Sequence, residues 1–278
     1  DLLEAIILGI VQGATEFLPV SSSAHLVLIS WWLGYGTPSL LYTVVVHVGT
    51  ATAVLFYFRE EWLTLLKAAW QTLQTRQIDL RHNIEQRLLF LLFLSSLPTA
   101  IFGLLLADFF EEQFSKPAVV SISLWITAAL LIYGERSGKK DANTELNATE
   151  VKSTDAILIG IAQTLAIMPG ISRSGSTIAA GLFRGLSRSA ATRYSFLLAT
   201  PIILSAGLKQ ALDVFTGDVN VTSELSLSLL VGFITSASVG YACIAFLLQY
   251  VRQRSLYGFA LYCVIFGAIS LGAVIVQG

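Results

Sequence analysis

The sequence predicts an all-α polytopic membrane protein with six transmembrane helices and two re-entrant helical hairpins. Three observations lead to this prediction. Hydrophobic residues make up 55% of the chain and charged residues only 13%, whereas soluble domains carry about 25% charged residues. Six apolar stretches approach the roughly 20 residues that a helix needs to cross a bilayer. Two further apolar stretches are interrupted at mid-length by proline and small polar residues.

The six spans lie, in chain order, at about 39–58, 88–107, 118–134, 190–208, 225–250 and 257–277. The polar segment 59–87 contains EEWLTLLKAAWQTL, whose apolar residues recur at helical spacing. This pattern predicts an amphipathic helix on the cytoplasmic membrane surface. The formal net charge of −1 and the lack of a basic run argue against a nucleic-acid partner.

The two interrupted stretches are 2–34 and 156–187, broken by GATEFLPVSSSAH (13–25) and IMPGISRSGST (167–177). Proline with serine, glycine and threonine ends a helix and frees backbone polar groups. Lipid cannot hydrogen-bond these groups, so such a break is tolerated only where protein or a water-filled cavity covers it. We therefore expect re-entrant hairpins at 1–35 and 156–187.

The basic residues support this topology. If each hairpin returns to its starting side, one side of the membrane carries the segments 59–87, 135–155, 184–193 and 251–256. Those segments contain Arg59, Lys67, Arg76, Arg81, Arg87, Arg136, Lys139, Lys140, Lys152, Arg184, Arg188, Arg193, Arg252 and Arg254. The other side holds Lys116 and Lys209. The positive-inside rule makes the basic side cytoplasmic and places both termini outside.

The chain also contains an internal repeat. AIILGIVQ (5–12) matches AILIGIAQ (156–163) at five of eight positions, and Pro19 and Ser22 align with Pro169 and Ser172. The domains are therefore repeat 1 (1–134), a cytoplasmic linker (135–155) and repeat 2 (156–278). Because each repeat has three spans, the second enters the membrane from the opposite side. Inverted repeats of this kind place a site near the midplane.

Glu16 is the first candidate functional residue. A carboxylate at membrane depth costs a few kcal/mol, and such groups face cavities and mark function. The alternative is a structural role, in which Glu16 caps amides freed near Pro19. Gln12 lies one helical turn earlier on the same face, so both side chains can reach one bound group.

Arg173 is the strongest signal in the second break. Hydroxyl side chains and glycines surround it and resemble a cradle for an oxyanion, and guanidinium groups bind phosphate bidentately. We expect backbone N–H groups at the start of the following helix, from about Thr177, to add to this site. The alternative is a purely structural Arg173–Glu16 bridge. The candidate binding residues are Gln12, Ser21, Ser172, Ser174 and Thr177.

Ser22 and His25 have the spacing of a nucleophile and its base. Histidine can deprotonate serine or protonate a leaving oxygen. For His47, in the 39–58 span, a packing role is favoured over a functional one. Three histidines and two separated cysteines make no His/Cys metal cluster. A hard divalent cation, Mg²⁺ or Ca²⁺, remains open through Glu16 and substrate phosphate oxygens.

The motifs QGATEFLPVSSSAH (12–25) and PGISRSGST (169–177) together resemble the undecaprenyl-diphosphate phosphatase family of bacteria, the bacitracin-resistance BacA type. The resemblance covers essentially the whole chain. The first acidic position of the family's Glu-x-x-x-Glu element is Gln12 here, which weakens any model with two metal-binding carboxylates. The paired-histidine motifs of the other lipid phosphatases are missing from this sequence.

The resemblance implies hydrolysis of a C55 polyprenyl diphosphate in the bacterial plasma membrane, which recycles the lipid carrier of the cell wall. It implies Ser22 as nucleophile, with Glu16, His25 and Arg173 as the functional charged groups. Covalent attack by serine and direct attack by water remain open, and a homo-oligomer is compatible with the sequence. The alternative function is a transporter or flippase of the polyprenyl phosphate, because inverted repeats are typical of transporters. A non-catalytic anion channel is a third possibility.

Overall fold

The computed structural model describes residues 2–106, 109, 112–138, 151–216 and 223–277, and these residues contain helices and no extended strands. Residues 139–150 of the predicted linker, with Lys139 and Lys140, lie outside the described residues. The helices are α1 (Leu2–Phe17), α2 (Ser22–Leu33), α3 (Leu40–Tyr57), α4 (Arg59–Thr75), α5 (Ile84–Leu105), α7 (Pro117–Ser137), α8 (Ser153–Leu165), α9 (Arg173–Phe183), α10 (Arg188–Phe215), α11 (Ser223–Tyr250) and α12 (Tyr257–Gln277).

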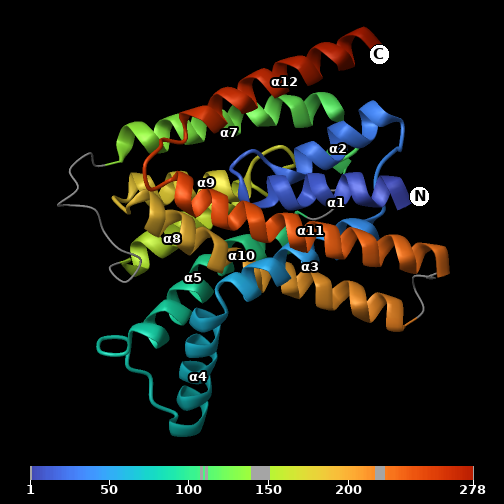
Figure 1. Ribbon diagram of the computed structural model, residues 1–278. Coiled ribbons are helices and arrows are strands. Elements are labelled where there is room, and N and C mark those ends of the chain that lie inside the picture. The colour runs from blue at the N-terminus through green and yellow to red at the C-terminus, as the bar shows by residue number, and fades with distance from the viewer. Residues whose placement is uncertain (1, 107–108, 110–111, 139–150, 217–222, 278) are drawn as a thin grey trace.

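The prediction of six spans in an all-helical membrane protein is confirmed. Within the described chain, α3, α5, α7, α10, α11 and α12 are long and apolar enough to cross a membrane. The protein is therefore a multi-pass membrane protein. In Figure 1, α1 begins and α12 ends at the same end of the bundle.

The two interrupted stretches form pairs of shorter helices, α1 with α2 and α8 with α9. α2 has 12 residues and α9 has 11, so each is less than about 20 Å long. That is too short to cross a hydrocarbon core of about 30 Å. In each pair the two helices pack against one another, while α1 also packs on α11 and α8 on α5. This arrangement is compatible with re-entrant hairpins in two interlocked repeats.

Each break has a local cause. Ser21 adopts φ 71° and caps α2 by accepting a hydrogen bond from the backbone N–H of Ala24 at 3.4 Å. Gly170 adopts φ 94°, and a Cβ atom there would lie 2.5 Å from both the Val120 carbonyl oxygen and the Ser123 Cβ. Only glycine fits this position, because it alone has both the conformational freedom and the small size.

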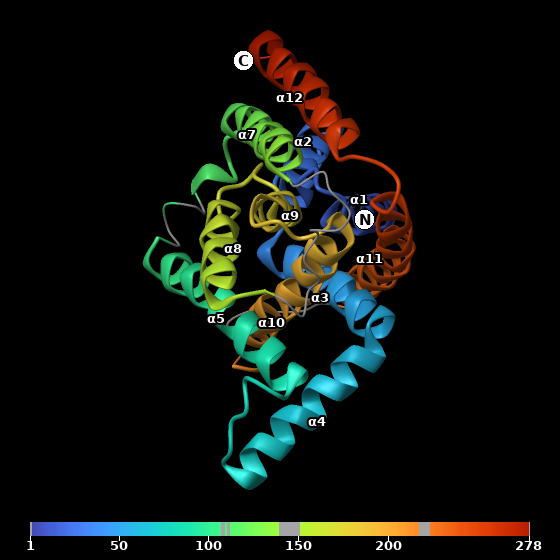
Figure 2. The ribbon, with the colours of Figure 1, turned by 90° about the vertical axis from the view of Figure 1, so that its left-hand side faces the viewer.

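The predicted amphipathic helix is present as α4. Figures 1 and 2 show it at a steep angle to the spans, projecting away from the side of the bundle next to α5. Leu65 and Ala68 are buried, while Leu66, Trp70 and Leu73 are exposed. Such an orientation suits a helix that lies on a membrane surface.

Two ion pairs hold the site-bearing helices at the end where α8 begins. Arg184 donates to Asp155 at 2.7 Å, and Arg188 makes a two-pronged contact with Glu135 at 2.8 and 2.7 Å. Both carboxylate side chains are 2% exposed, so removing either arginine would leave a buried charge unpaired. These pairs fix the segment between α9 and α10 against α7 and α8. Figure 2 shows α9 near the centre of the bundle.

Candidate active site

A cavity of about 260 Å³ lies where the two helix breaks meet. The first break contributes Glu16 and the serines 21–23, and the second contributes Ser172 and Arg173. His47 of α3, Thr99 of α5 and Gln163 of α8 also line it, together with apolar residues of α10 and Phe114. The cavity is therefore polar around Glu16 and Arg173. Its other walls are apolar, formed by residues of α10 and by Ala166, Ile167 and Ile171 of the second break.

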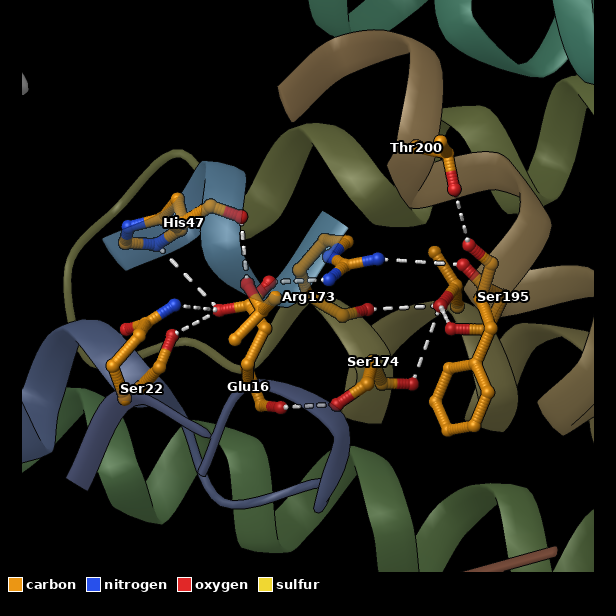
Figure 3. Close-up of polar contacts among 12 residues, drawn as sticks. Glu16, Ser22, His47, Arg173, Ser174, Ser195 and Thr200 are labelled. Atoms are coloured by element: carbon orange, nitrogen blue, oxygen red, sulfur yellow. Dashed lines mark hydrogen bonds and ion pairs between the residues drawn. The ribbon is translucent and has the colours of Figure 1, made fainter. Parts of the chain in front are cut away.

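Glu16, at the end of α1, is the centre of the polar wall (Figure 3). Its Oε2 atom accepts hydrogen bonds from the Ser22 hydroxyl at 2.6 Å and from the Gln12 amide at 2.9 Å. The Glu16 side chain is only 6% exposed. A carboxylate in such surroundings is the acceptor that a serine hydroxyl needs when it loses its proton.

Arg173 joins the second break to the first. Its Nη2 atom donates to Glu16 Oε1 at 2.5 Å, and its Nη1 atom donates to the Ser195 carbonyl oxygen at 3.3 Å. Two further hydrogen bonds connect the breaks: Ser174 Oγ donates to the Leu18 carbonyl at 3.2 Å, and the Gly170 N–H donates to Ser23 Oγ at 3.2 Å. The Arg173–Glu16 contact of the alternative interpretation is thus present, and both residues also line the cavity.

The N-termini of two helices meet at this cavity. Ser22 is the first residue of α2, and Arg173 is the first residue of α9. The prediction that the second helix begins near Thr177 was wrong, because Ser172 caps it by accepting from the Gly175 N–H at 3.0 Å. The first N–H groups of a helix have no partner within it, and together with the helix dipole they favour bound anions.

Several predicted binding residues lie behind the cavity wall. Gln12 is fully buried and contacts Glu16. Thr177 donates to the Ser195 hydroxyl at 2.7 Å, and Ser174 contacts Leu18 as described above. Among the predicted binding residues, Ser21 and Ser172 line the cavity itself. Gln12, Ser174 and Thr177 are not among the described residues that line it.

The two intramembrane histidines have the opposite placement to that expected. His25 points away from the cavity: Nδ1 donates to the Ser21 carbonyl at 2.7 Å, and Nε2 accepts from the Tyr262 hydroxyl at 2.7 Å. Its ring also stacks on Phe266 with centroids 4.5 Å apart. His47, for which packing was favoured, lines the cavity with Nε2 3.5 Å from Glu16 Oε2. This geometry therefore does not support His25 as the base for Ser22.

Gln163 lines the cavity but was not predicted from the sequence. Its Nε2 atom donates to Thr99 Oγ1 at 3.1 Å, while its buried Oε1 atom has no hydrogen-bond partner. A buried polar atom without a partner costs about 1–3 kcal/mol. The internal repeat carried the signal for this residue, because Gln163 is the counterpart of Gln12 in AILIGIAQ.

The residues at the cavity provide a limited site for a divalent cation. Among the described residues, no group of three or more His, Cys, Asp or Glu side chains is placed to hold a metal ion. Among the described residues that line the cavity, Glu16 brings the one carboxylate, and Arg173 forms an ion pair with it. The donors therefore fit a hard cation that arrives with phosphate oxygens of a substrate, the usual mode for Mg²⁺.

Comparison with known proteins agrees with this geometry. A family model described as bacitracin resistance protein BacA matches residues 5–269, which include both breaks. The chain belongs to the BacA family. It is 39% identical to the undecaprenyl-diphosphatase of Desulforudis audaxviator, over 99% of this chain and 98% of that protein. It is 40% identical to the protein of the same name from Elusimicrobium minutum, over 96% of both chains. With that of Methanosphaera stadtmanae it shares 41% identity over 98% of this chain and 97% of the relative.

In this member of the BacA family, we expect His25 to act by holding the Ser21 carbonyl. His25→Ala should lower kcat about 10- to 100-fold, the usual scale for a misplaced reacting group. His25→Asn should recover most of the rate, because its amide N–H can replace Nδ1–H. The measurement is the pH dependence of kcat for both variants. A role as general base would instead leave Asn as impaired as Ala and remove the acidic limb of the profile.

Proposed function

We propose that this protein hydrolyses undecaprenyl diphosphate to undecaprenyl phosphate and inorganic phosphate, and so recycles the lipid carrier of cell-wall synthesis. The observation that carries the proposal is the contact of Ser22 and Arg173 with one carboxylate, Glu16, beside a cavity at two helix N-termini. A nucleophile, a proton acceptor and an anion-binding arginine are what phosphoryl transfer requires. The curated relatives carry the name of this activity.

In the proposed mechanism, Ser22 Oγ attacks the terminal phosphorus and its proton passes to Glu16. The bond between that phosphorus and the bridging oxygen breaks, and the lipid monophosphate leaves. Water then hydrolyses the phosphoserine and releases phosphate. Arg173 and the N–H groups that begin α2 and α9 stabilise the negative charge of the transition state. His47 acts by holding Glu16 Oε2.

A divalent cation, Mg²⁺ or Ca²⁺, completes the proposed site. It would be held by Glu16 and by phosphate oxygens of the substrate, and it would neutralise charge on the diphosphate. Ser22 and Arg173 keep their roles in this arrangement. A homo-oligomer stays a prediction.

We also propose that the protein lies in the bacterial plasma membrane with both termini and the cavity mouth outside. Phe114 lines both the cavity and a second hollow of about 310 Å³, which Gly34, Thr37 and Pro117 also line. These residues lie between spans on the side that carries few lysine and arginine residues. Phe114 therefore lies between the cavity and a hollow on the proposed outer side, which supports an opening in that direction.

Thiol labelling tests this orientation. In a chain with Cys243 and Cys263 replaced by alanine, an impermeant maleimide added to intact spheroplasts should label Thr37→Cys. It should not label Gln77→Cys, beyond the end of α4, until the membrane is opened. Both positions are exposed. The reverse pattern would place the cavity mouth on the cytoplasmic side.

The function is tested by phosphate release from undecaprenyl diphosphate in detergent. Arg173→Lys should lower kcat by roughly 10²–10³, the loss typical for one transition-state donor. Lysine keeps the charge but cannot contact Glu16 and the Ser195 carbonyl with one planar group. Arg193→Lys is the matched control: its contact with Glu61 is about half-exposed, so its rate should stay within about twofold. Lipid movement without phosphate release would instead indicate a flippase.

The covalent step predicts a phosphoserine. Acid quenching of the wild-type protein during turnover of substrate labelled on the terminal phosphate should trap label on Ser22, and Ser22→Ala should lose both label and turnover. Turnover of Ser22→Ala close to that of the wild type would exclude serine as the nucleophile. Lost turnover in Ser22→Ala without any trapped label in the wild type would favour attack by water activated by Glu16.

A further inference from the structure

A second, larger cavity adjoins the polar one and opens along the side of the bundle. This groove measures about 690 Å³ and lies mainly between α5 and α10, with Trp62 of α4 at one end. Thr99 and Ile202 line both the groove and the polar cavity, so the two spaces share a wall. Along α5 the groove reaches from Leu89 to Leu104, a distance of about 22 Å at 1.5 Å per residue.

The surface of the groove is apolar. Most of its lining residues are hydrocarbon, and two of its three hydroxyl groups are used within their own helices. Ser96 donates to the Leu92 carbonyl at 2.8 Å, and Ser205 donates to the Pro201 carbonyl at 2.7 Å. The third, Thr99, accepts from Gln163 of the polar cavity. No charged side chain lines the groove among the described residues.

The groove faces the lipid side of two transmembrane helices. Phe93 and Leu104, on its rim, are 63% and 84% exposed. Both α5 and α10 contain a proline, Pro98 and Pro201. Prolines bend helices and open spaces between them. A long apolar molecule can therefore enter this groove sideways from the bilayer.

We infer that this groove binds the first isoprene units of the polyprenyl chain whose diphosphate occupies the polar cavity. The inference rests on the proposed function and adds the site of the lipid tail. A diphosphate held beside Arg173 leaves its chain inside the protein, and an apolar chain needs an apolar path to the membrane. Thr99 and Ile202 line both spaces, so the junction between the diphosphate and the isoprenoid tail lies beside these two residues.

Gly103 lines the groove and has room for a larger side chain. A Cβ atom at Gly103 would meet only Ile167 Cδ1, at 3.8 Å, so a larger side chain would extend into the groove. Gly272 of α12 is the matched control, because it occupies a similar place near the C-terminal end of its helix and a Cβ atom there meets nothing within 4 Å. Ala206, on the opposite wall, provides a second filling position.

For undecaprenyl diphosphate, Gly103→Phe and Ala206→Phe should each raise KM roughly tenfold, with the effect in KM rather than in kcat. Gly272→Phe should leave KM within about twofold. Unchanged KM values in both filling variants would overturn the assignment, and so would an equal rise in the control.

A second measurement uses the wild-type protein and does not depend on folding of the variants. The probe is a farnesyl methylenediphosphonate, which cannot be hydrolysed, with a diazirine on its second isoprene unit. It should label peptides from 84–105 and 188–215, and undecaprenyl diphosphate should compete with it. Labelling of other helices, or labelling without competition as expected of bulk lipid, would reject the tail site. Wild-type protein that releases no phosphate would refute the proposed function instead, whatever the labelling pattern.

Discussion

The contact between Glu16 and Arg173 is the interaction on which the rest of the structure depends. It joins two helix breaks that are 157 residues apart in the chain, and both side chains are largely buried. Removing one partner of a buried ion pair costs about 3–5 kcal/mol, because the other charge is left without compensation. The pair therefore keeps the breaks together while leaving Ser22 and the two helix N-termini beside a cavity.

The same pair bears on the proposal that the substrate binds together with a divalent cation. Without substrate, the charges of Glu16 and Arg173 neutralise each other. A diphosphate competes with Glu16 for Arg173 and adds negative charge next to the carboxylate. A divalent cation held by Glu16 and by phosphate oxygens would offset this added charge. The charge of Arg173 favours the transition state when its guanidinium contacts the phosphates.

The sequence predicted the spans, the two breaks and Glu16, Ser22 and Arg173, because polar and ionisable residues are conspicuous in apolar segments. The placement of the histidines depends on tertiary packing, which spacing does not reveal. Ser22 and His25 lie on one turn of α2, yet Ser22 faces α1 and His25 faces α12. His47 reaches Glu16 only because α3 packs beside α1. The internal repeat aligns Gln163 with Gln12, so the sequence could also have predicted Gln163 as a site residue.

The same backbone N–H groups, at the N-termini of α2 and α9, meet two requirements of this fold. The first N–H groups of α2 and α9 have no partner within their helices and cannot be left facing lipid. An anion needs several oriented donors that displace its water. Ser21 and Ser172 each cap one of these N–H groups. Turning both N-termini toward one cavity presents the remaining groups to phosphate oxygens of the proposed substrate. The groove between α5 and α10 only needs to hold the tail in an apolar environment. Polar groups therefore concentrate in the cavity at the helix breaks, with Thr99 at the boundary between the two spaces.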